Sequence, residues 1–186
     1  MDKESVLLDS EDRMDKALGA LDRDFSRLRT GRASTGLVDN IKVDYYGTPT
    51  PINQIAAVSV AEARVLAISP WDASMMGAIE RAILTSDIGI NPTNDGRVMR
   101  LVFPAPTEER RRQLTKDVQK LGEETKVAVR NVRREAMDKF KSLKKNSEIT
   151  EDDQKNLEEE MQKITDKFVK QIDKDCEAKN KEIMEI

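Results

Sequence analysis

The sequence predicts an α+β protein in which a small α+β domain is inserted into an elongated antiparallel three-helix bundle. Two observations carry this prediction. Apolar residues recur every three or four positions near the N-terminus and again after residue 106, as on one face of an α-helix. All six prolines and six of the eight glycines lie between residues 31 and 106, where short β-branched stretches alternate with turn-forming residues.

The first helix is expected before Gly31. Its apolar residues are separated alternately by four and three positions, which places all of them on one stripe of the helix surface. The stripe comprises Met14, Leu18, Leu21, Phe25 and Leu28.

A much longer helix is expected to begin after Thr107, which is a good N-cap residue. Glu108 and Glu109 follow in the first turn, where the helix dipole favours negative charge. This helix should extend to about Lys145. Its apolar stripe comprises Leu114, Val118, Leu121, Thr125, Ala128, Val132, Ala136, Phe140 and Leu143.

A third helix is expected after a break at Asn146 and Ser147. Thr150 can cap it, and Asp153 can reach back as in a capping box. Each of the two long helices would exceed about 50 Å at about 1.5 Å per residue, and neither is stable alone, so both must pack with the first helix. The third stripe comprises Leu157, Met161, Ile164, Phe168, Ile172, Cys176 and Ile183.

The inserted domain, residues 31–106, combines short strands with one helix. Strands are expected within residues 40–47, 56–60, 64–69 and 96–103. Turn formers such as Thr48–Pro51 and Asn94–Gly96 separate them. Residues 72–87 predict a helix that closes over the sheet with the side chains of Met76, Ile79 and Ile83.

The chain therefore crosses twice between a bundle of residues 1–30 and 107–186 and a small domain of residues 31–106. The crossings are Thr30-Gly31-Arg32 and Pro104-Ala105-Pro106. Gly31 permits unusual φ values and the prolines stiffen the second crossing. These features favour a hinge about which one compact body rotates against the other. Two rigid connectors are the alternative.

The composition argues against an enzyme. The chain has no histidine and one cysteine, Cys176, so it lacks the residues of a common zinc or thiol site. Cys176 lies on an apolar stripe, which favours a small buried side chain over a nucleophile. Paired carboxylates lie on solvated helix faces without a cleft to raise their pKa. We expect no cofactor, no metal and no catalytic residue.

The small domain offers few polar candidates for a pocket. Tyr45, Tyr46 and Arg64 are the conspicuous ones. Adjacent residues of a strand point to opposite faces, so the two tyrosines should not line one pocket.

Three features predict a cytoplasmic protein. No apolar run approaches the about 20 residues that span a bilayer. The first twelve residues are acidic, whereas a signal or transit peptide is basic. A single cysteine cannot form an internal disulfide, which fits a reducing compartment. Neither a membrane nor DNA is an expected partner.

Charge is divided unevenly between the two long helices. Residues 107–145 contain thirteen Lys and Arg against seven Asp and Glu, a net charge of +6. Residues 146–186 contain seven against thirteen, a net charge of −6. Pairing between the helices explains the totals, although each exposed pair contributes only roughly a few tenths of a kcal/mol.

The pattern of the positive charges points to an anionic partner. On a helical wheel at about 100° per residue, a basic face lies away from the apolar stripe, and Glu124, Glu135 and Asp138 gather on the opposite flank. Arginine predominates, and its planar guanidinium binds two phosphate oxygens and stacks on bases. Structured RNA is favoured, with an acidic protein or a solvated surface as alternatives. The basic face comprises Arg112, Lys116, Lys126, Arg130, Arg133 and Arg134.

Several stretches, in order along nearly the whole chain, resemble the hallmarks of bacterial ribosome recycling factor. They are LRTGRAS (28–34), VDYYGTPTPINQIA (43–56), LTSDIGINP (84–92), PTEERRRQLTK (106–116) and VAVRNVRREAMDK (127–139). The resemblance implies an L-shaped protein, a three-helix bundle with a small β/α/β domain. It also implies a protein that binds the 70S ribosome after termination. With elongation factor G and GTP hydrolysis by that partner, it would split the ribosome and free it from mRNA.

The resemblance also implies roles for individual residues. Arg133, within RNVRRE, matches the family's main RNA-contacting arginine, and Arg130 and Arg134 would flank it on large-subunit rRNA. Arg110, within EERRR, matches a second basic position near the joint. On the helical wheel Arg110 lies near the apolar stripe, so a role in the joint is the alternative.

The resemblance extends to the two crossings. Arg29 and Arg32 would flank the family's first hinge strand. The second strand departs from the family pattern, because Ala105-Pro106 stands where Pro-Leu is usual. A closed three-helix bundle leaves no unpaired apolar stripe, so a monomer is expected.

Two other functions remain open on the residues alone. A helical adaptor or chaperone would bind proteins through the bundle or the small domain, and its binding would be indifferent to the arginine cluster. An RNA-binding role away from the ribosome would use the same arginine face.

Overall fold

The computed structural model describes residues 2–185, which fold into two compact units. The first contains the residues up to Phe25 and Thr115–Lys181. The second contains Ser26–Leu114 and the last helical turn from Glu182. The domain boundaries expected at residues 30/31 and 106/107 lie near these divisions and stay a prediction.

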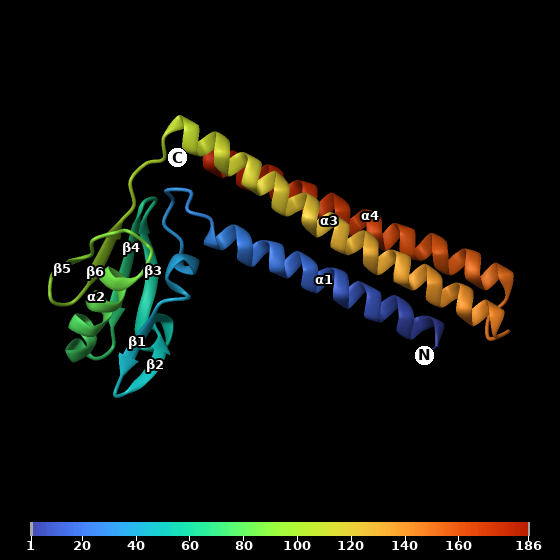
Figure 1. Cartoon of the computed structure of the whole chain (residues 1–186), viewed down its shortest axis with the longest axis horizontal. Helices are drawn as coiled ribbons and strands as arrows, with labels where there is room; N and C mark the ends of the chain where they lie inside the picture. Colours follow the sequence, from blue (N-terminus) through green and yellow to red (C-terminus); the bar gives the residue numbers. More distant parts are fainter. Residues whose placement is uncertain (1, 186) are drawn as a thin grey trace. The chain divides into compact units, whose positions relative to one another are not determined.

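The first unit is a bundle of three helices that lie side by side (Figure 1). The helices are α1 (Lys3–Arg27), α3 (Glu108–Lys145) and α4 (Glu151–Met184). The expected cap of α3 is confirmed, because the backbone N–H of Arg110 donates a hydrogen bond to Oγ1 of Thr107 at 3.1 Å.

The break before α4 and its capping box are also confirmed. Ser147 lies in the left-handed region at φ 60°. The backbone N–H of Asp153 donates to Oγ1 of Thr150, and that of Thr150 donates to Oδ2 of Asp153, both at 3.1 Å. The Asp153 carboxylate accepts hydrogen bonds first from the Thr150 backbone N–H and then from the Thr150 hydroxyl, and these lower the pKa of the carboxyl below its ordinary value.

Ion pairs define the directions of the helices. On α1 and α4 the partners advance together, since Lys3 pairs with Asp153 at 3.2 Å and Glu11 pairs with Lys167 at 3.7 Å. These two helices are therefore parallel. Between α1 and α3, Asp9 pairs with Lys139 at 3.6 Å and Arg13 pairs with Glu135 at 2.6 Å. The residue numbers rise on α1 as they fall on α3, so these two helices are antiparallel.

The predicted stripes form the bundle core, with one register correction on α3. Gly122 and Val129 are buried there, whereas Leu121 is half-buried and Ala128 is exposed. The prediction that Ala128 is buried was therefore wrong. The predicted stripe residues that are half-buried, at the edge of the core, are Leu121, Leu18, Leu28, Thr125, Ile164 and Cys176. A glycine adds nothing to an apolar pattern, yet Cys176 packs so closely that a Cβ on Gly122 would lie 2.5 Å from its Sγ. The other stripe residues that are buried are Met14, Leu21, Phe25, Leu114, Val118, Val132, Ala136, Phe140, Leu143, Leu157, Met161, Phe168, Ile172 and Ile183.

The second unit contains two antiparallel sheets. The larger has the strand order β3-β4-β6-β5. Its strands are β3 (Ala56–Glu62), β4 (Val65–Pro70), β5 (Thr93–Asn94) and β6 (Met99–Val102). The smaller sheet is the hairpin of β1 (Lys42–Tyr45) and β2 (Thr48–Pro51).

The hairpin corrects the assignment of Thr48–Pro51 as a turn. This segment is a strand whose partners run from Tyr45 opposite Thr48 to Lys42 opposite Pro51. A strand at a sheet edge accommodates proline, which lacks an N–H to donate. The turn is formed by Tyr46 and Gly47 at φ 48° and 86°, as a two-residue hairpin loop requires.

The core of the second unit lies between the larger sheet and one helix. The expected helix is confirmed as a short 3₁₀ turn followed by α2 (Met76–Thr85). Its residues Met76, Ile79 and Ile83 are buried in the same cluster as Leu66 and Leu101 of the sheet. Among the helices described, none is long and apolar enough to cross a membrane.

Candidate nucleic-acid interface

Arg130 and Arg134 provide open positive charge on α3. They lie four residues apart on α3, so they share one helix face, and both are exposed. Neither side chain makes a hydrogen bond or an ion pair with any residue between 2 and 185. All donors of both guanidinium groups are thus available to an external acceptor, as the sequence predicts for an anion-binding face.

Arg133 lies differently, because it is half-buried against α4. Its Nη1 donates a hydrogen bond to Oε1 of Gln162 at 2.9 Å. Gln162 in turn donates from Nε2 to Oδ1 of Asp166 at 2.8 Å. This chain of contacts fixes the direction of the Arg133 side chain and uses one of five guanidinium donors. Arg133 is therefore preoriented beside its two exposed neighbours.

Lys126 is neutralised within the bundle. Its Nζ lies 2.5 Å from Asp173 and 3.2 Å from Glu123, and its side chain is 15% exposed. The hydrogen bond to Asp173 is the main cause of a raised pKa for Lys126, so the ammonium stays charged and paired. Lys126 was expected on a basic face open to an anionic partner, and this expectation is wrong because its charge is already paired.

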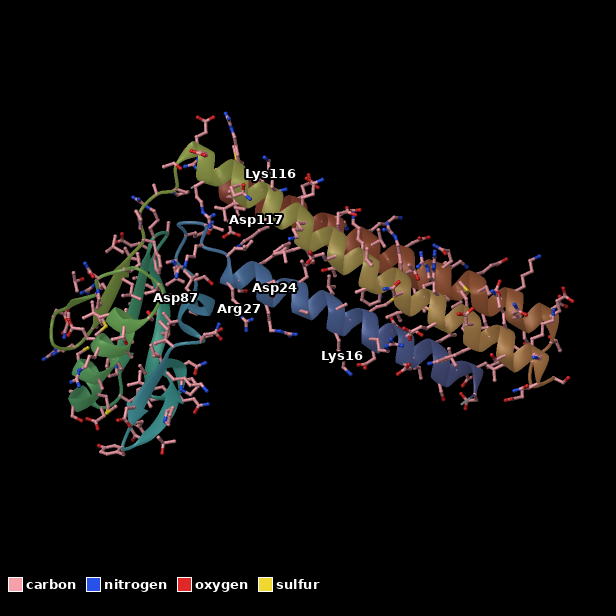
Figure 2. The ribbon with its side chains drawn as sticks, viewed as in Figure 1. Lys16, Asp24, Arg27, Asp87, Lys116 and Asp117 are labelled. Carbon is pink, nitrogen blue, oxygen red and sulfur yellow. The ribbon has the colours of Figure 1, made fainter. Side chains whose placement is uncertain are left out.

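The first turns of α3, which belong to the second unit, carry two further candidates. Arg112 pairs with Glu108 at 2.7 Å, so its charge, like that of Lys126, is already paired. Arg110 is exposed and lines a cavity of about 310 Å³ with Pro104, Pro106 and other residues of that unit. This position agrees with the alternative that the helical wheel suggested for Arg110, a role in the joint. Lys116 is exposed on α3 (Figure 2).

The three residues of the acidic flank of α3 are all paired. Glu124 pairs with Lys120 and Asp138 with Lys141 on the same helix, whereas Glu135 pairs with α1. Glu135 accepts a hydrogen bond from Nη1 of Arg13 at 2.6 Å, and this contact lowers the pKa of Glu135. Each acid of this flank therefore has a cationic partner, whereas the guanidinium groups of Arg130 and Arg134 stay open.

The two crossings run in close contact inside the second unit. Gly31 has φ 83°, and a Cβ there would lie 2.5 Å from Cδ of Pro106 and 3.0 Å from the carbonyl oxygen of Pro104. Thr30 is buried, and its Oγ1 accepts a hydrogen bond from the backbone N–H of Arg32 at 3.3 Å. Only glycine satisfies both the backbone angle and the lack of space.

Side-chain contacts also anchor the flanks of the first crossing. Arg29 donates a hydrogen bond to the backbone carbonyl of Asp87. The Nε of Arg32 lies 3.9 Å from Oε1 of Glu182. Ala105 is exposed between the two prolines. The expected hinge residues are thus brought together in the fold, and their motion stays a prediction.

The structure also describes the two tyrosines and the cysteine that the sequence analysis considered. Tyr45 and Tyr46 contact each other edge to face, with ring centroids 4.7 Å apart. The expectation of opposite faces was wrong because Tyr46 belongs to the turn. Burial raises the pKa of the Cys176 thiol, which disfavours a reactive thiolate. Among residues 2–185, no group of three acidic, His or Cys side chains could hold a metal.

Comparison with known proteins identifies the family. The sequence profile described as "Ribosome recycling factor" matches residues 21–184. The chain belongs to the ribosome recycling factor family. A ribosome-recycling factor of Nitratidesulfovibrio vulgaris is 58% identical over 186 residues, covering 100% of both chains. That of Thermosipho africanus is 51% identical over 183 residues, covering 98% of this chain and 99% of the relative.

Solved structures of ribosome recycling factors agree with the fold. A solution structure has a TM-score of 0.79 and 43% identity, covering 100% of this chain and 99% of the other. A second structure, that of the T. thermophilus factor, has a TM-score of 0.71 and 43% identity, covering 98% of this chain and 99% of the other. In this second structure the T. thermophilus factor and E. coli elongation factor G are bound to the E. coli post-termination complex.

Two residues of this site were missed in the sequence. Gln162 holds Arg133, and Asp173 neutralises Lys126. Both lie on α4, and the one sequence signal for them was the net charge of −6 in residues 146–186. That signal predicts pairing between the helices but not which residues pair.

Proposed function

We propose that this protein recycles the ribosome after termination by docking its arginine face on large-subunit rRNA. The observation that carries the proposal is the pair of open guanidinium groups of Arg130 and Arg134 beside the preoriented Arg133. Planar guanidinium groups suit phosphate oxygens and base stacking. The related structure, in which the T. thermophilus factor is bound to the post-termination complex, supports the ribosome as the target.

The other basic residues would act around this centre. Lys116 lies on the same helix and is exposed. Lys126 and Arg112 would have to exchange carboxylate partners for phosphate, so their contribution to affinity should be smaller. Arg110, beside Pro104 and Pro106, would contact RNA near the crossings.

The proposed mechanism is mechanical. The bundle would bind rRNA, and the small domain of residues 31–106 would present a surface to elongation factor G. Motion about Gly31 and Pro104–Pro106 would let that factor apply force, which the bundle transmits into the subunit interface. Hydrolysis of GTP belongs to the partner, so this chain, a cytoplasmic monomer, needs no catalytic group and no cofactor. The presence of elongation factor G on the same complex as the related factor supports the assignment.

A binding experiment with purified 70S ribosomes tests the docking surface. The test variant carries Arg130→Ala, Arg133→Ala and Arg134→Ala. A matched control replaces three exposed cations of α4, which have no ion-pair partner within residues 2–185, and it carries Lys155→Ala, Lys163→Ala and Lys170→Ala. Affinity is measured across a salt series, with circular dichroism as the check that each variant is folded.

The salt dependence identifies the contact type. Each lost phosphate contact lowers the slope of log K against log salt by about 0.7 to 0.9. The arginine variant should therefore bind far more weakly, with a slope reduced by about 2, whereas the lysine control should match wild type. Equal binding by all three proteins would refute the assignment of this face, and equal weakening of both variants would show only a dependence on net charge.

A further inference from the structure

The bundle carries a groove between α1 and α4 that is apolar and acidic, in contrast to the arginine face of α3. Two hollows of about 510 and 570 Å³ lie along these helices. Both are lined by Leu8 and Glu11, so they form one continuous feature, here called the α1–α4 groove. Its apolar lining includes Leu7, Leu8, Leu18, Ile164 and Phe168.

The groove exposes apolar surface that the bundle core does not need. Leu8 is 68% exposed, although leucine is among the residues most often buried. Leu7, Leu18 and Ile164 are half-buried around it. Apolar side chains gathered in a groove with polar edges are typical of a protein-binding surface.

The walls of the groove are acidic. Six carboxylates and two lysines line it. Lys3 and Lys167 are already paired with Asp153 and Glu11. Glu4, Asp15 and Glu160 have no cationic partner in the described part of the chain. The groove therefore repels phosphate and attracts cations, which excludes RNA as its occupant.

The length of the groove fits a short helix. It extends along α1 from Lys3 to Leu18, about 22 Å at about 1.5 Å per residue. Because α1 and α4 run parallel here, a helix lying between them would pack as a fourth member of the bundle. Its apolar residues at positions i, i+4, i+7 and i+11 would face Leu8, with basic residues along both walls.

We propose that the α1–α4 groove binds a cationic amphipathic helical segment of another protein. The occupant follows from the combination of an apolar floor with unpaired carboxylates on its walls. This surface involves α1, whereas the arginine face does not, so the proposal is independent of docking on rRNA.

A designed peptide of about 18 residues (about five helical turns) tests the proposal. It carries leucine at positions i, i+4, i+7 and i+11, lysine elsewhere, and a fluorescent label. The groove variant is Glu4→Lys, Asp15→Lys and Glu160→Lys. The matched control reverses three exposed carboxylates outside the groove, Glu62→Lys, Glu159→Lys and Glu177→Lys. Fluorescence anisotropy gives the affinities, and circular dichroism verifies folding.

Wild type and the control should bind alike, and the groove variant should bind at least about tenfold more weakly, because only it places cations beside the peptide. Leu8→Ser, which keeps the charge, should also weaken binding. In NMR spectra the peptide should shift the methyl resonances of Leu8, Leu18 and Ile164. No binding by wild type, or equal weakening of both charge variants, would overturn the proposal.

A second copy of this chain is the competing occupant. Sedimentation equilibrium of wild type and Leu8→Ser without peptide separates the two. A monomer in both cases supports the peptide site. Self-association that Leu8→Ser abolishes would show that the groove binds another copy, and would overturn the proposal.

Discussion

Replacing Gly122 by alanine tests how closely α3 and α4 pack. In an exposed helix this change stabilises by roughly 0.5 to 1 kcal/mol, because alanine loses less backbone entropy on folding. Here the added methyl group would lie 2.5 Å from Sγ of Cys176 and 3.8 Å from Cγ2 of Ile172. Overpacking of a core costs about 1 to 3 kcal/mol. The overpacking term is larger, so we expect net destabilisation of about 1 kcal/mol.

Gly122→Ala should instead raise the free energy of unfolding when Cys176 is also replaced by alanine. That replacement removes the atom that the new methyl group meets. Cys176 is half-buried and its Sγ lies 3.9 Å from the carbonyl oxygen of Val118, a weak contact, so the single replacement costs little. In this background Gly122→Ala should stabilise by up to about 1 kcal/mol, which gives a coupling energy of about 1 to 3 kcal/mol.

Urea unfolding followed by circular dichroism measures all four proteins of this cycle, and equal m-values are the condition for comparing them. Gly19→Ala on α1 is the matched control. A Cβ there would lie 3.6 Å from Nη1 of Arg23, an ordinary contact, so it should stabilise by roughly 0.5 to 1 kcal/mol. If Gly122→Ala has the same effect with and without the Cys176 thiol, the close packing of these two residues is refuted.

Three further changes test other parts of the fold. Thr107→Ala removes the cap of α3 and should lower the free energy of unfolding by about 1 kcal/mol, measured in urea. Gly31→Ala would place a Cβ 2.5 Å from Pro106 at φ 83°, and the strain plus the clash should destabilise by more than about 2 kcal/mol in the same assay. Asp95 accepts backbone hydrogen bonds, the strongest from Val98, that lower its pKa to about 2. Its contribution to stability is therefore present above its ordinary pKa and lost as pH falls toward about 2, so NMR titration should place its midpoint there and Asp95→Asn should flatten this acid dependence.

The helices could be predicted because their signals are local. Thr107 and Thr150 cap their helices through residues three positions away, and a capping box needs no knowledge of the rest of the fold. The prediction of a turn at Thr48–Pro51 was wrong because the structure of this segment depends on a partner elsewhere in the chain. Its composition is typical of a turn, and only pairing with Lys42–Tyr45 makes it a strand. Gly122 was left out of the predicted stripe because its place in the core is seen only in its close packing against Cys176, a residue of another helix.

The residues of the candidate site likewise divide into those that local sequence could predict and those that depend on another helix. The exposure of Arg130 and Arg134 follows from helical periodicity alone, so the sequence was sufficient to predict it. The state of Lys126 and Arg133 depends on which α4 residues lie opposite them, and this depends on how the two helices are aligned along their length. Charge totals constrain that alignment only weakly, because many pairings satisfy +6 against −6.

If the arginine face docks on rRNA as we propose, positive charge on α3 has two separate uses, which a count of basic residues cannot distinguish. Lys126 is held by two carboxylates, and moving it to a phosphate would leave Asp173 without its partner. In the proposed complex Arg130 and Arg134 would give up no protein contact, so the full attraction to phosphate would contribute to affinity. Arg133 lies between these cases, since its contact with Gln162 is to a neutral group and leaves its charge uncompensated. The contact therefore orients the guanidinium without weakening its attraction to an anion, a combination that lysine could not reproduce because it lacks the planar fork of donors.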